Sequence, residues 1–101
     1  PRPIFTESTY SFGKVRKGQK VNARFKFRND GKAPFKVYKV DADGKIACSG
    51  IPEAGAGETV SFNIELDTAD LPKGETLTIV TLTTNSPLRP IVNLFIAGFI
   101  E

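Results

Sequence analysis

The sequence offers few side chains that could carry out chemistry, and its one cysteine, Cys48, is the first to consider. A nucleophilic thiol needs a basic group or a metal nearby to lower its pKa. The 101-residue chain contains no histidine, which removes Ser–His and Cys–His nucleophilic pairs and the commonest metal ligand. We therefore expect Cys48 to be a small buried apolar side chain. A single cysteine also excludes a disulfide within the chain.

Two aspartates have the spacing of a paired-carboxylate site. Asp41 and Asp43 lie two residues apart, so a strand there would direct both carboxylates to one side. Asp43 also precedes Gly44, and Asp-Gly is a common tight-turn dipeptide. A calcium site needs more oxygen ligands than this neighbourhood offers. We expect these residues to serve turn geometry rather than acid–base catalysis or metal binding.

The segment GIPEAGAGET, residues 50–59, has part of the outline of a phosphate-binding loop. Gly50 and Gly55 have the glycine spacing of G-x-x-x-x-G-K-[ST], but Ala56 stands in place of the lysine. A strand pattern follows, not a helix whose N-terminus could face a phosphate. We expect an inter-strand loop. The chain thus has no apparent catalytic residue, metal ligand set or cofactor site, and we expect no enzyme unless a partner domain supplies the missing groups.

Basic residues are concentrated in the stretch VNARFKFRNDGKAPF, residues 21–35. Its cationic side chains alternate with aromatic ones, and successive side chains of a strand point to opposite faces. The aromatic rings then enter the core and cannot stack on bases, so nucleic-acid binding is not expected. Polyanion binding through charge alone is the remaining alternative. The cationic residues are Arg24, Lys26 and Arg28, and the rings between them are Phe25 and Phe27.

Charge divides unevenly along the chain, whose net charge is +3. Residues 1–45 contain twelve Lys/Arg and four Asp/Glu (+8), whereas residues 46–101 contain two and seven (−5). Such a division steers acidic partners or pairs the two halves with each other. In an immunoglobulin-type sandwich, residues 20–28 and 58–67 would be antiparallel neighbours. We expect Glu65 and Asp67 to face the basic residues across that pair.

Alternation of apolar and polar residues with period two recurs along the chain and indicates half-buried strands. Turn residues separate the runs, and no segment has the apolar periodicity of a helix. Short strands with a turn every ~8–12 residues predict an all-β fold of about seven strands, a β-sandwich or a small barrel. The expected strands are residues 9–12, 20–28, 35–42, 58–67, 76–84 and a last run that contains Val92, Leu94 and Ile96.

The length fits one domain over residues 1–101, and no apolar run approaches the ~20 residues of a membrane helix. The chain begins with Pro1 and contains no methionine. We therefore expect a processed chain or a domain excised from a longer protein. Any targeting signal would then lie upstream.

The run FGKVRKGQKVNARFKFRNDGKAPFKVYKV, residues 12–40, resembles a family of bacterial immunoglobulin-like domains of unknown function. The family pattern runs F-G-x-V-x-x-G, then an alternating strand, then F-x-x-N-x-G-x-x-P, and more distantly it resembles Hydin-like and major-sperm-protein-like domains. The resemblance extends over roughly residues 9–100 through GETVSFNIELDT and TTNSP. The matching positions are Phe12, Gly13, Val15, Gly18, Phe27, Asn29 or Asp30, Gly31 and Pro34.

Members of that family often have a Cys-Gly-Cys cluster after the third strand, where this chain has VDADGKIACSG with one cysteine. No redox or metal role of such a pair can be transferred to it. The resemblance implies an immunoglobulin-like sandwich, export to the periplasm or cell surface, and neighbouring domains in a longer protein. It implies no activity.

The last two predicted strands are apolar on both sides. If Val80 and Leu82 face the core opposite Ile96 and Leu94, the other face of the hairpin is apolar too. A solvated sheet face is normally polar, and an exposed apolar patch marks an interface. A register slip or bulge that returns these residues to the core is the alternative. The residues of this candidate domain-docking face are Leu77, Ile79, Phe95 and Phe99.

Two functions follow from these patterns. The first is a non-catalytic module of an exported protein, a spacer, scaffold or protein-interaction domain that packs on a neighbouring domain or another protein. The second is a carbohydrate- or peptide-binding module that uses sheet edges or loops. Only Tyr10 and Tyr38 would offer polar-tipped rings to a sugar, since tryptophan is absent.

Overall fold

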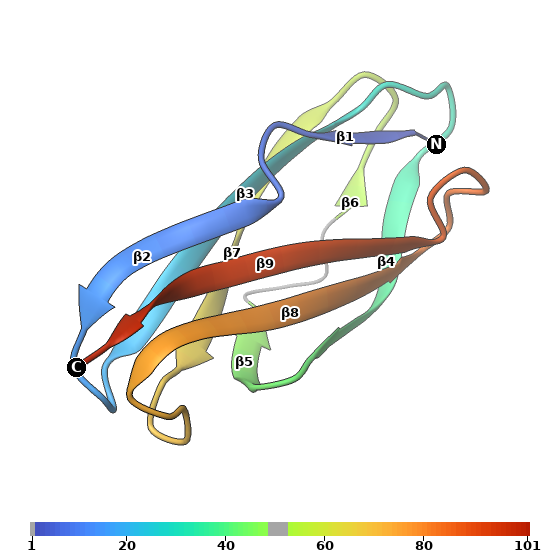
Figure 1. Cartoon of the computed structure of the whole chain (residues 1–101). Coiled ribbons are helices and arrows are strands. Elements are labelled where there is room, and N and C mark those ends of the chain that lie inside the picture. Colours follow the sequence, from blue (N-terminus) through green and yellow to red (C-terminus); the bar gives the residue numbers. More distant parts are fainter. Residues whose placement is uncertain (1, 49–52) are drawn as a thin grey trace.

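The alternating runs of the sequence form two facing β-sheets. The structure, a computed structural model, describes residues 2–48 and 53–101. These residues form strands and connecting turns with no helix among them, so the expected all-β immunoglobulin-like sandwich is confirmed (Figure 1). They contain nine strands, not about seven, because three short strands were not expected. The strands are β1 (Pro3–Phe5), β2 (Thr9–Val15), β3 (Lys20–Asn29), β4 (Phe35–Ala42), β5 (Lys45–Cys48), β6 (Glu53–Ala54), β7 (Thr59–Asp67), β8 (Gly74–Thr84) and β9 (Ile91–Ile100).

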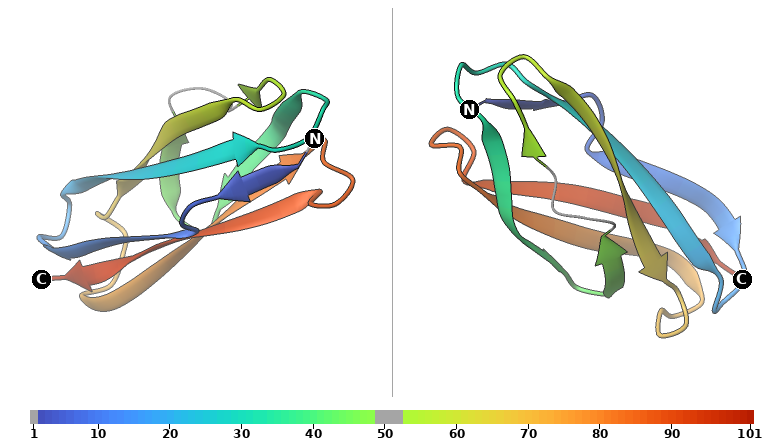
Figure 2. Two further views of the ribbon diagram at one scale, coloured as in Figure 1. Left: turned by 90° about the horizontal axis from the view of Figure 1, so that it is seen from above. Right: turned by 180° about the vertical axis from the view of Figure 1, so that it is seen from behind.

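The two sheets lie face to face as separate layers (Figure 2). One has the strand order β1-β3-β7-β5, and the other has the order β2-β9-β8-β4-β6. All neighbouring strands are antiparallel except β2 and β9, which run parallel. Strands that follow one another along the chain lie in different sheets, except β8 and β9, which form a hairpin within one sheet. The connections between strands therefore join the two layers at many points.

The core lies between the sheets, and β3 illustrates how the sequence builds it. Every second residue of β3 is buried and every other one is exposed. Its aromatic rings enter the core, where Phe27 meets the ring of Phe35 from the opposite sheet with centroids 5.1 Å apart. Phe25 meets Phe62 of β7 at 5.9 Å. The expectation that these rings are unavailable for base stacking is confirmed, since both are almost fully buried.

The expected charge pairing across β3 and β7 is wrong for most of the basic residues. The two strands are antiparallel neighbours as predicted, but the register places Glu65 opposite Asn22 and Asp67 opposite Lys20. The carboxylates thus lie at the end of the pair where β3 begins, beyond reach of a directly opposite arginine. The basic residues face neutral polar ones: Arg24 lies opposite Asn63, Lys26 opposite Ser61, and Arg28 opposite Thr59.

The β8–β9 hairpin has a different register from the one expected, but the same faces. Val80 lies opposite Leu94, and Leu82 lies opposite Val92, which is a shift of two residues from the predicted pairing. A shift of two preserves which side each residue faces. Hydrogen bonds within the loop set this register, because Thr84 N–H donates to the carbonyl of Pro90 at 2.8 Å. All four core-facing residues named in the prediction are fully buried.

Asn29 joins three segments at the end of β3. Its buried side-chain Oδ1 accepts hydrogen bonds from the backbone N–H groups of Arg2 at 3.0 Å and Gly31 at 3.1 Å. Its Nδ2 donates to the carbonyls of Ala33 at 2.7 Å and Ala54 at 3.2 Å. The structure thereby resolves the choice between Asn29 and Asp30 in the sequence pattern. Asn29 is the buried residue that closes the β3–β4 turn.

Candidate interaction face

The outer face of β8, β9 and β2 gathers the four residues of the candidate docking face. Three cross-strand rows make up its surface, and each row continues from β8 through β9 to β2. Ile79, Phe95 and Thr9 form the first, Leu77, Ala97 and Ser11 the second, and Glu75, Phe99 and Lys14 the third.

The apolar residues of this face are accessible to solvent. Leu77 is 54% exposed, Ile79 37% and Phe99 40%, whereas Phe95 is half-buried between its row neighbours. The register shift of two residues therefore did not return them to the core, and β8 and β9 contain no bulge, since their pairing runs unbroken from Gly74 to Thr83. The hairpin is apolar on both sides.

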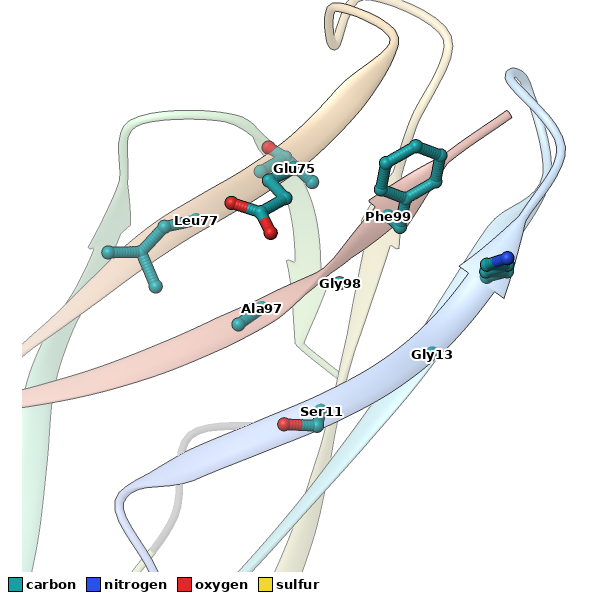
Figure 3. A pocket seen from close by; sticks show the side chains of 9 residues that line it. Ser11, Gly13, Glu75, Leu77, Ala97, Gly98 and Phe99 are labelled. Atoms are coloured by element: carbon teal, nitrogen blue, oxygen red, sulfur yellow. The ribbon is translucent and has the colours of Figure 1, made fainter.

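A shallow groove of about 570 Å³ crosses this face (Figure 3). Small residues form its floor where β9 passes β2, and Leu77 and Phe99 stand on either side of it. Sequence reasoning identified these two walls and missed the floor. In the sequence, the only sign of the floor was the pair of small residues Ala97-Gly98. Such a pair does not predict a groove unless its pairing with β2 is known. The floor residues are Ser11, Gly13, Ala97 and Gly98.

Beneath the groove, on the inner face of the sheet, Gly98 contacts Phe12. The ring of Phe12 lies against Gly98 on the core side, in the space that a Cβ would occupy. β2 can therefore approach β9 closely at this point. The phenylalanine of the F-G-x-V pattern and a glycine eighty-six positions later thus form one contact (98 − 12 = 86).

Two opposite charges border the groove at its third row. The Lys14 ammonium lies 5.9 Å from the centroid of the Phe99 ring, within range of a cation–π interaction. Glu75 lies on the other side of Phe99, directly opposite it on β8. The face becomes polar further along the hairpin, where Thr81 Oγ1 and Asn93 Oδ1 are 3.0 Å apart. The apolar surface is therefore bounded by polar groups at both ends.

The residues considered for chemistry do not form a site. Asp41 makes an ion pair with Lys39 at 3.2 Å, and Asp43 Oδ1 accepts a hydrogen bond from Ile79 N–H at 2.9 Å. Asp43 thus fastens the β4–β5 crossing to β8 rather than turning a hairpin. Cys48 is half-buried at the end of β5. Within residues 2–48 and 53–101, no group of three or more His, Cys, Asp or Glu side chains could hold a metal ion.

The expected inter-strand loop that has part of the outline of a phosphate-binding loop falls partly outside the described residues, since Gly50 lies in the segment 49–52. The part that is described forms a tight turn before β7. There Glu58 N–H donates to the carbonyl of Gly55 at 3.0 Å, and Gly57 N–H donates to the carbonyl of Asn29 at 2.7 Å. These backbone N–H groups are committed to the turn and to Asn29.

The edges of the two sheets are short or irregular. β1 has three residues, β6 has two and β5 has four. β2 is longer, but its pairing shifts register between Ser11 and Lys14, and Gly13 there has a φ of +72°. Short and bulged edge strands hinder the addition of another strand to a sheet. β6 covers only Phe35 and Lys36 of β4, so the part of β4 from Val37 to Ala42 has no further strand beside it among the described residues.

The shortest ion pair among the described residues joins β5 to the connection between β7 and β8. Lys45 Nζ and Asp70 Oδ2 are 2.8 Å apart. The hydrogen bond and charge of Asp70 raise the pKa of Lys45 above its ordinary value, and those of Lys45 lower the pKa of Asp70. Both side chains are exposed, so the pair is a surface contact rather than a perturbed functional site.

Comparison with known proteins gives a family and a fold. The model of a family described as "Protein of unknown function (DUF1573)" matches residues 4–100. No protein with a curated function matches the sequence. Among solved structures, a protein of unknown function from Porphyromonas gingivalis W83 has a TM-score of 0.78 at 15% identity. The match covers 97% of this chain and 46% of that protein.

Two further structures have the same fold. An ASH/PapD-like domain of human CEP192 (PapD-like domain 7) has a TM-score of 0.75 at 10% identity, with 99% of this chain and 85% of that chain covered. The periplasmic chaperone SfaE has a TM-score of 0.64 at 12% identity, with 98% and 56% covered. The immunoglobulin-like, PapD-like sandwich is thereby established. The described residues include no helix long and apolar enough to cross a membrane.

Proposed function

The chain belongs to the DUF1573 family of proteins of unknown function, and from that premise we propose that it is a non-catalytic protein-interaction module of an exported protein. It docks on a neighbouring domain of the same chain. The docking face consists of Leu77, Ile79, Phe95 and Phe99 around the groove. No catalytic or cofactor-binding role is assigned to any residue.

One observation carries this proposal: the β8–β9 hairpin exposes large apolar side chains on the face that points away from the core. An antiparallel sheet with one solvated face normally alternates apolar and polar residues. Three exposed apolar side chains on two adjacent strands, with a groove between them, instead form a continuous patch. A partner that covers the patch removes this apolar area from water, which stabilises the complex.

A neighbouring domain is the occupant that the other observations support. The chain spans about half of the Porphyromonas protein and of SfaE, so this fold occurs there as one part of a longer chain. Phe99 lies two residues before the C-terminal residue Glu101. A segment that follows Glu101 would start beside the groove, at a high effective concentration for docking there. The periplasmic location of SfaE supports export in the same way, as an analogy of fold.

The runner-up, a carbohydrate- or peptide-binding module, has one supporting residue. Tyr38 is 64% exposed at an irregularity in the β4–β8 pairing, whereas Tyr10 packs against the core. Saturable binding in a glycan panel that Tyr38→Ala abolishes would favour this function. The edge strands β1 and β6 are too short to offer a peptide strand much, so such a peptide would have to add to β4 beyond Lys36.

Hydroxyl-radical footprinting of the parent protein tests the docking. Leu77 and Ile91 are exposed to similar extents, 54% and 51%, but only Leu77 lies at the groove. If the face is covered, Leu77 is oxidised several-fold more slowly than Ile91. In the parent protein carrying Phe95→Ser and Phe99→Ser, the two rates become similar. Equal rates in the wild-type parent, or an endogenous product with a mass near 11.0 kDa, would overturn the proposal.

A further inference from the structure

The outer face of the other sheet carries a row of cations that make no ion pair with the described residues. Arg24, Lys26 and Arg28 project from β3 on the exposed side. The structure gives none of them an ion pair with any described carboxylate; the ion pairs are Lys20–Glu65, Lys39–Asp41 and Lys45–Asp70. Alternate residues of a strand are about 6.8 Å apart, so the row is about 14 Å long. The three like charges repel one another along it.

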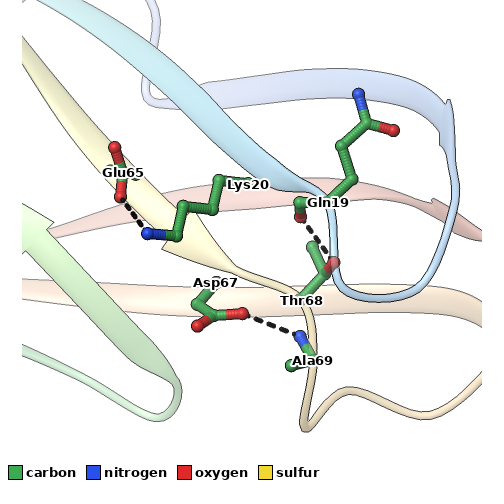
Figure 4. A network of polar contacts seen from close by, with 6 residues as sticks. All are labelled: Gln19, Lys20, Glu65, Asp67, Thr68 and Ala69. Carbon is green, nitrogen blue, oxygen red and sulfur yellow. Dashed lines mark hydrogen bonds and ion pairs between the residues drawn. The ribbon is translucent and has the colours of Figure 1, made fainter.

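The carboxylates of this face are occupied elsewhere (Figure 4). Glu65 lies 3.6 Å from Lys20, at the end where β3 begins. Asp67 Oδ1 accepts a hydrogen bond from Ala69 N–H at 2.9 Å, in the turn after β7. Both therefore hold that end of the sheet together and leave the row from Arg24 to Arg28 without counter-charge.

A parallel row of neutral hydrogen-bonding groups accompanies the cations. Asn63, Ser61 and Thr59 of β7 are exposed and lie opposite them. Their amide and hydroxyl groups can both donate and accept hydrogen bonds. The face thus offers one line of positive charge beside one line of polar groups, on two strands that pair with each other from Lys20 to Arg28. A ligand can be recognised here by side chains alone.

These features distinguish between classes of polyanion. The neighbouring rings Phe25 and Phe27 are buried, so this face has no aromatic platform for bases. Among the described residues, the apolar side chains at its border are Ile4, opposite Arg28, and the small Ala47, opposite Glu65, which give little to insert into a lipid surface. A peptide strand adds to the edge of a sheet through its backbone groups, not to an outer face such as this one. A linear acidic polysaccharide needs charge and hydrogen bonds to hydroxyls, which the two rows supply.

We propose that the outer face of β3 and β7 binds a linear acidic polysaccharide. Arg24, Lys26 and Arg28 pair with its carboxylate or sulfate groups, and Thr59, Ser61 and Asn63 hydrogen-bond to its hydroxyls. This site is on the opposite side of the sandwich from the docking face, so its function is independent of docking.

Titration calorimetry with a heparin decasaccharide and an oligogalacturonate at low and moderate salt tests the site. We expect saturable binding that weakens as salt rises. The variant Arg24→Gln, Lys26→Gln, Arg28→Gln should bind at least tenfold more weakly. The control Lys36→Gln, Lys39→Gln, Lys73→Gln has the same change in net charge on other surfaces and should change binding less than threefold. Equal losses in the two variants would overturn the proposal.

Three further measurements keep the result specific. Because the row is self-repelling, the β3 variant should melt at the same or a higher temperature than wild type at low salt, which separates lost binding from misfolding. Ser61→Ala with Asn63→Ala should weaken oligogalacturonate binding while binding of inorganic polyphosphate stays unchanged. The assignment to a polysaccharide would be overturned if the protein bound an oligothymidylate or phosphatidylglycerol vesicles more tightly than either saccharide, with ligands compared at equal charge.

Discussion

The ring of Phe12 on β2 occupies the space beside Gly98 on β9 that any larger residue would need. Gly98→Ala should destabilise the fold by about 1–3 kcal/mol, because overpacking moves the ring or the strand. Phe12→Leu in the same chain should recover part of that loss. Urea denaturation of the two single variants and the double variant measures the coupling. Additive losses would mean that the two residues do not share this space.

Asn29 should be the most sensitive polar residue of the described fold. Asn29→Ala leaves buried backbone groups of several segments without partners, at about 1–3 kcal/mol for each unsatisfied group. Asn29→Asp should be worse at neutral pH, since it replaces the Nδ2 donor with an oxygen facing the carbonyls of Ala33 and Ala54. Its loss should lessen at low pH, where the carboxyl is protonated. Chemical denaturation at pH 7 and pH 4 measures both effects.

The docking face should be dispensable for folding of this domain. Phe95→Ser with Phe99→Ser changes half-buried and exposed side chains, so its cost should be far below that of a core change. Leu94→Ser, one position away on the buried side, should cost more than about 3 kcal/mol, since it leaves a cavity and buries a hydroxyl. Thermal denaturation distinguishes them. If the Phe95/Phe99 variant unfolds, these residues belong to the core and the docking face is disproved.

The Lys45–Asp70 pair sets a small pH dependence. The pKa of Asp70 is lowered from its ordinary 3.8, so its contribution to stability is present above that value and lost as pH falls through the lowered pKa. The pKa of Lys45 is raised from its ordinary 10.5, so its contribution is present below that value and lost as pH rises through the raised pKa.

Asp70→Asn should therefore lower the melting temperature slightly between about pH 5 and pH 9, and the difference from wild type should close in strong acid. Glu101→Gln serves as the control for removal of one exposed carboxylate. A difference that persists unchanged in acid would show that Asp70 acts through its geometry rather than its charge.

The alternation of apolar and polar residues predicted the long strands, because each of these strands has one buried side. The boundaries of β4 are those expected, and β3 and β7 differ from expectation by one residue. β1 and β6 were not predicted because they have three and two residues, which is too few to show an alternating pattern. Asp43-Gly44 was expected to form a tight turn, and these two residues do connect β4 to β5. The two strands lie in different sheets, which a dipeptide alone could not reveal.

The candidate face was partly predictable for the same reason. The alternation of side chains along a strand was enough to place Leu77, Ile79, Phe95 and Phe99 on one side of the hairpin. A register error of two residues does not change which side a residue faces. The groove depends on β2 lying beside β9, which is a long-range parallel pairing. The unneutralised row on β3 likewise depends on register, since sequence reasoning placed the carboxylates of β7 opposite the basic residues.

The parallel pairing of β2 and β9 has a mechanical consequence. β1 begins at one end of the 45 Å long axis and β9 ends at the other (Figure 1). Tension between the two ends would pull β2 and β9 in opposite directions along their length. Their hydrogen bonds would then be sheared together instead of being opened one by one. A chain that contained this sandwich between two anchoring points would thus resist stretching at the β2–β9 pair.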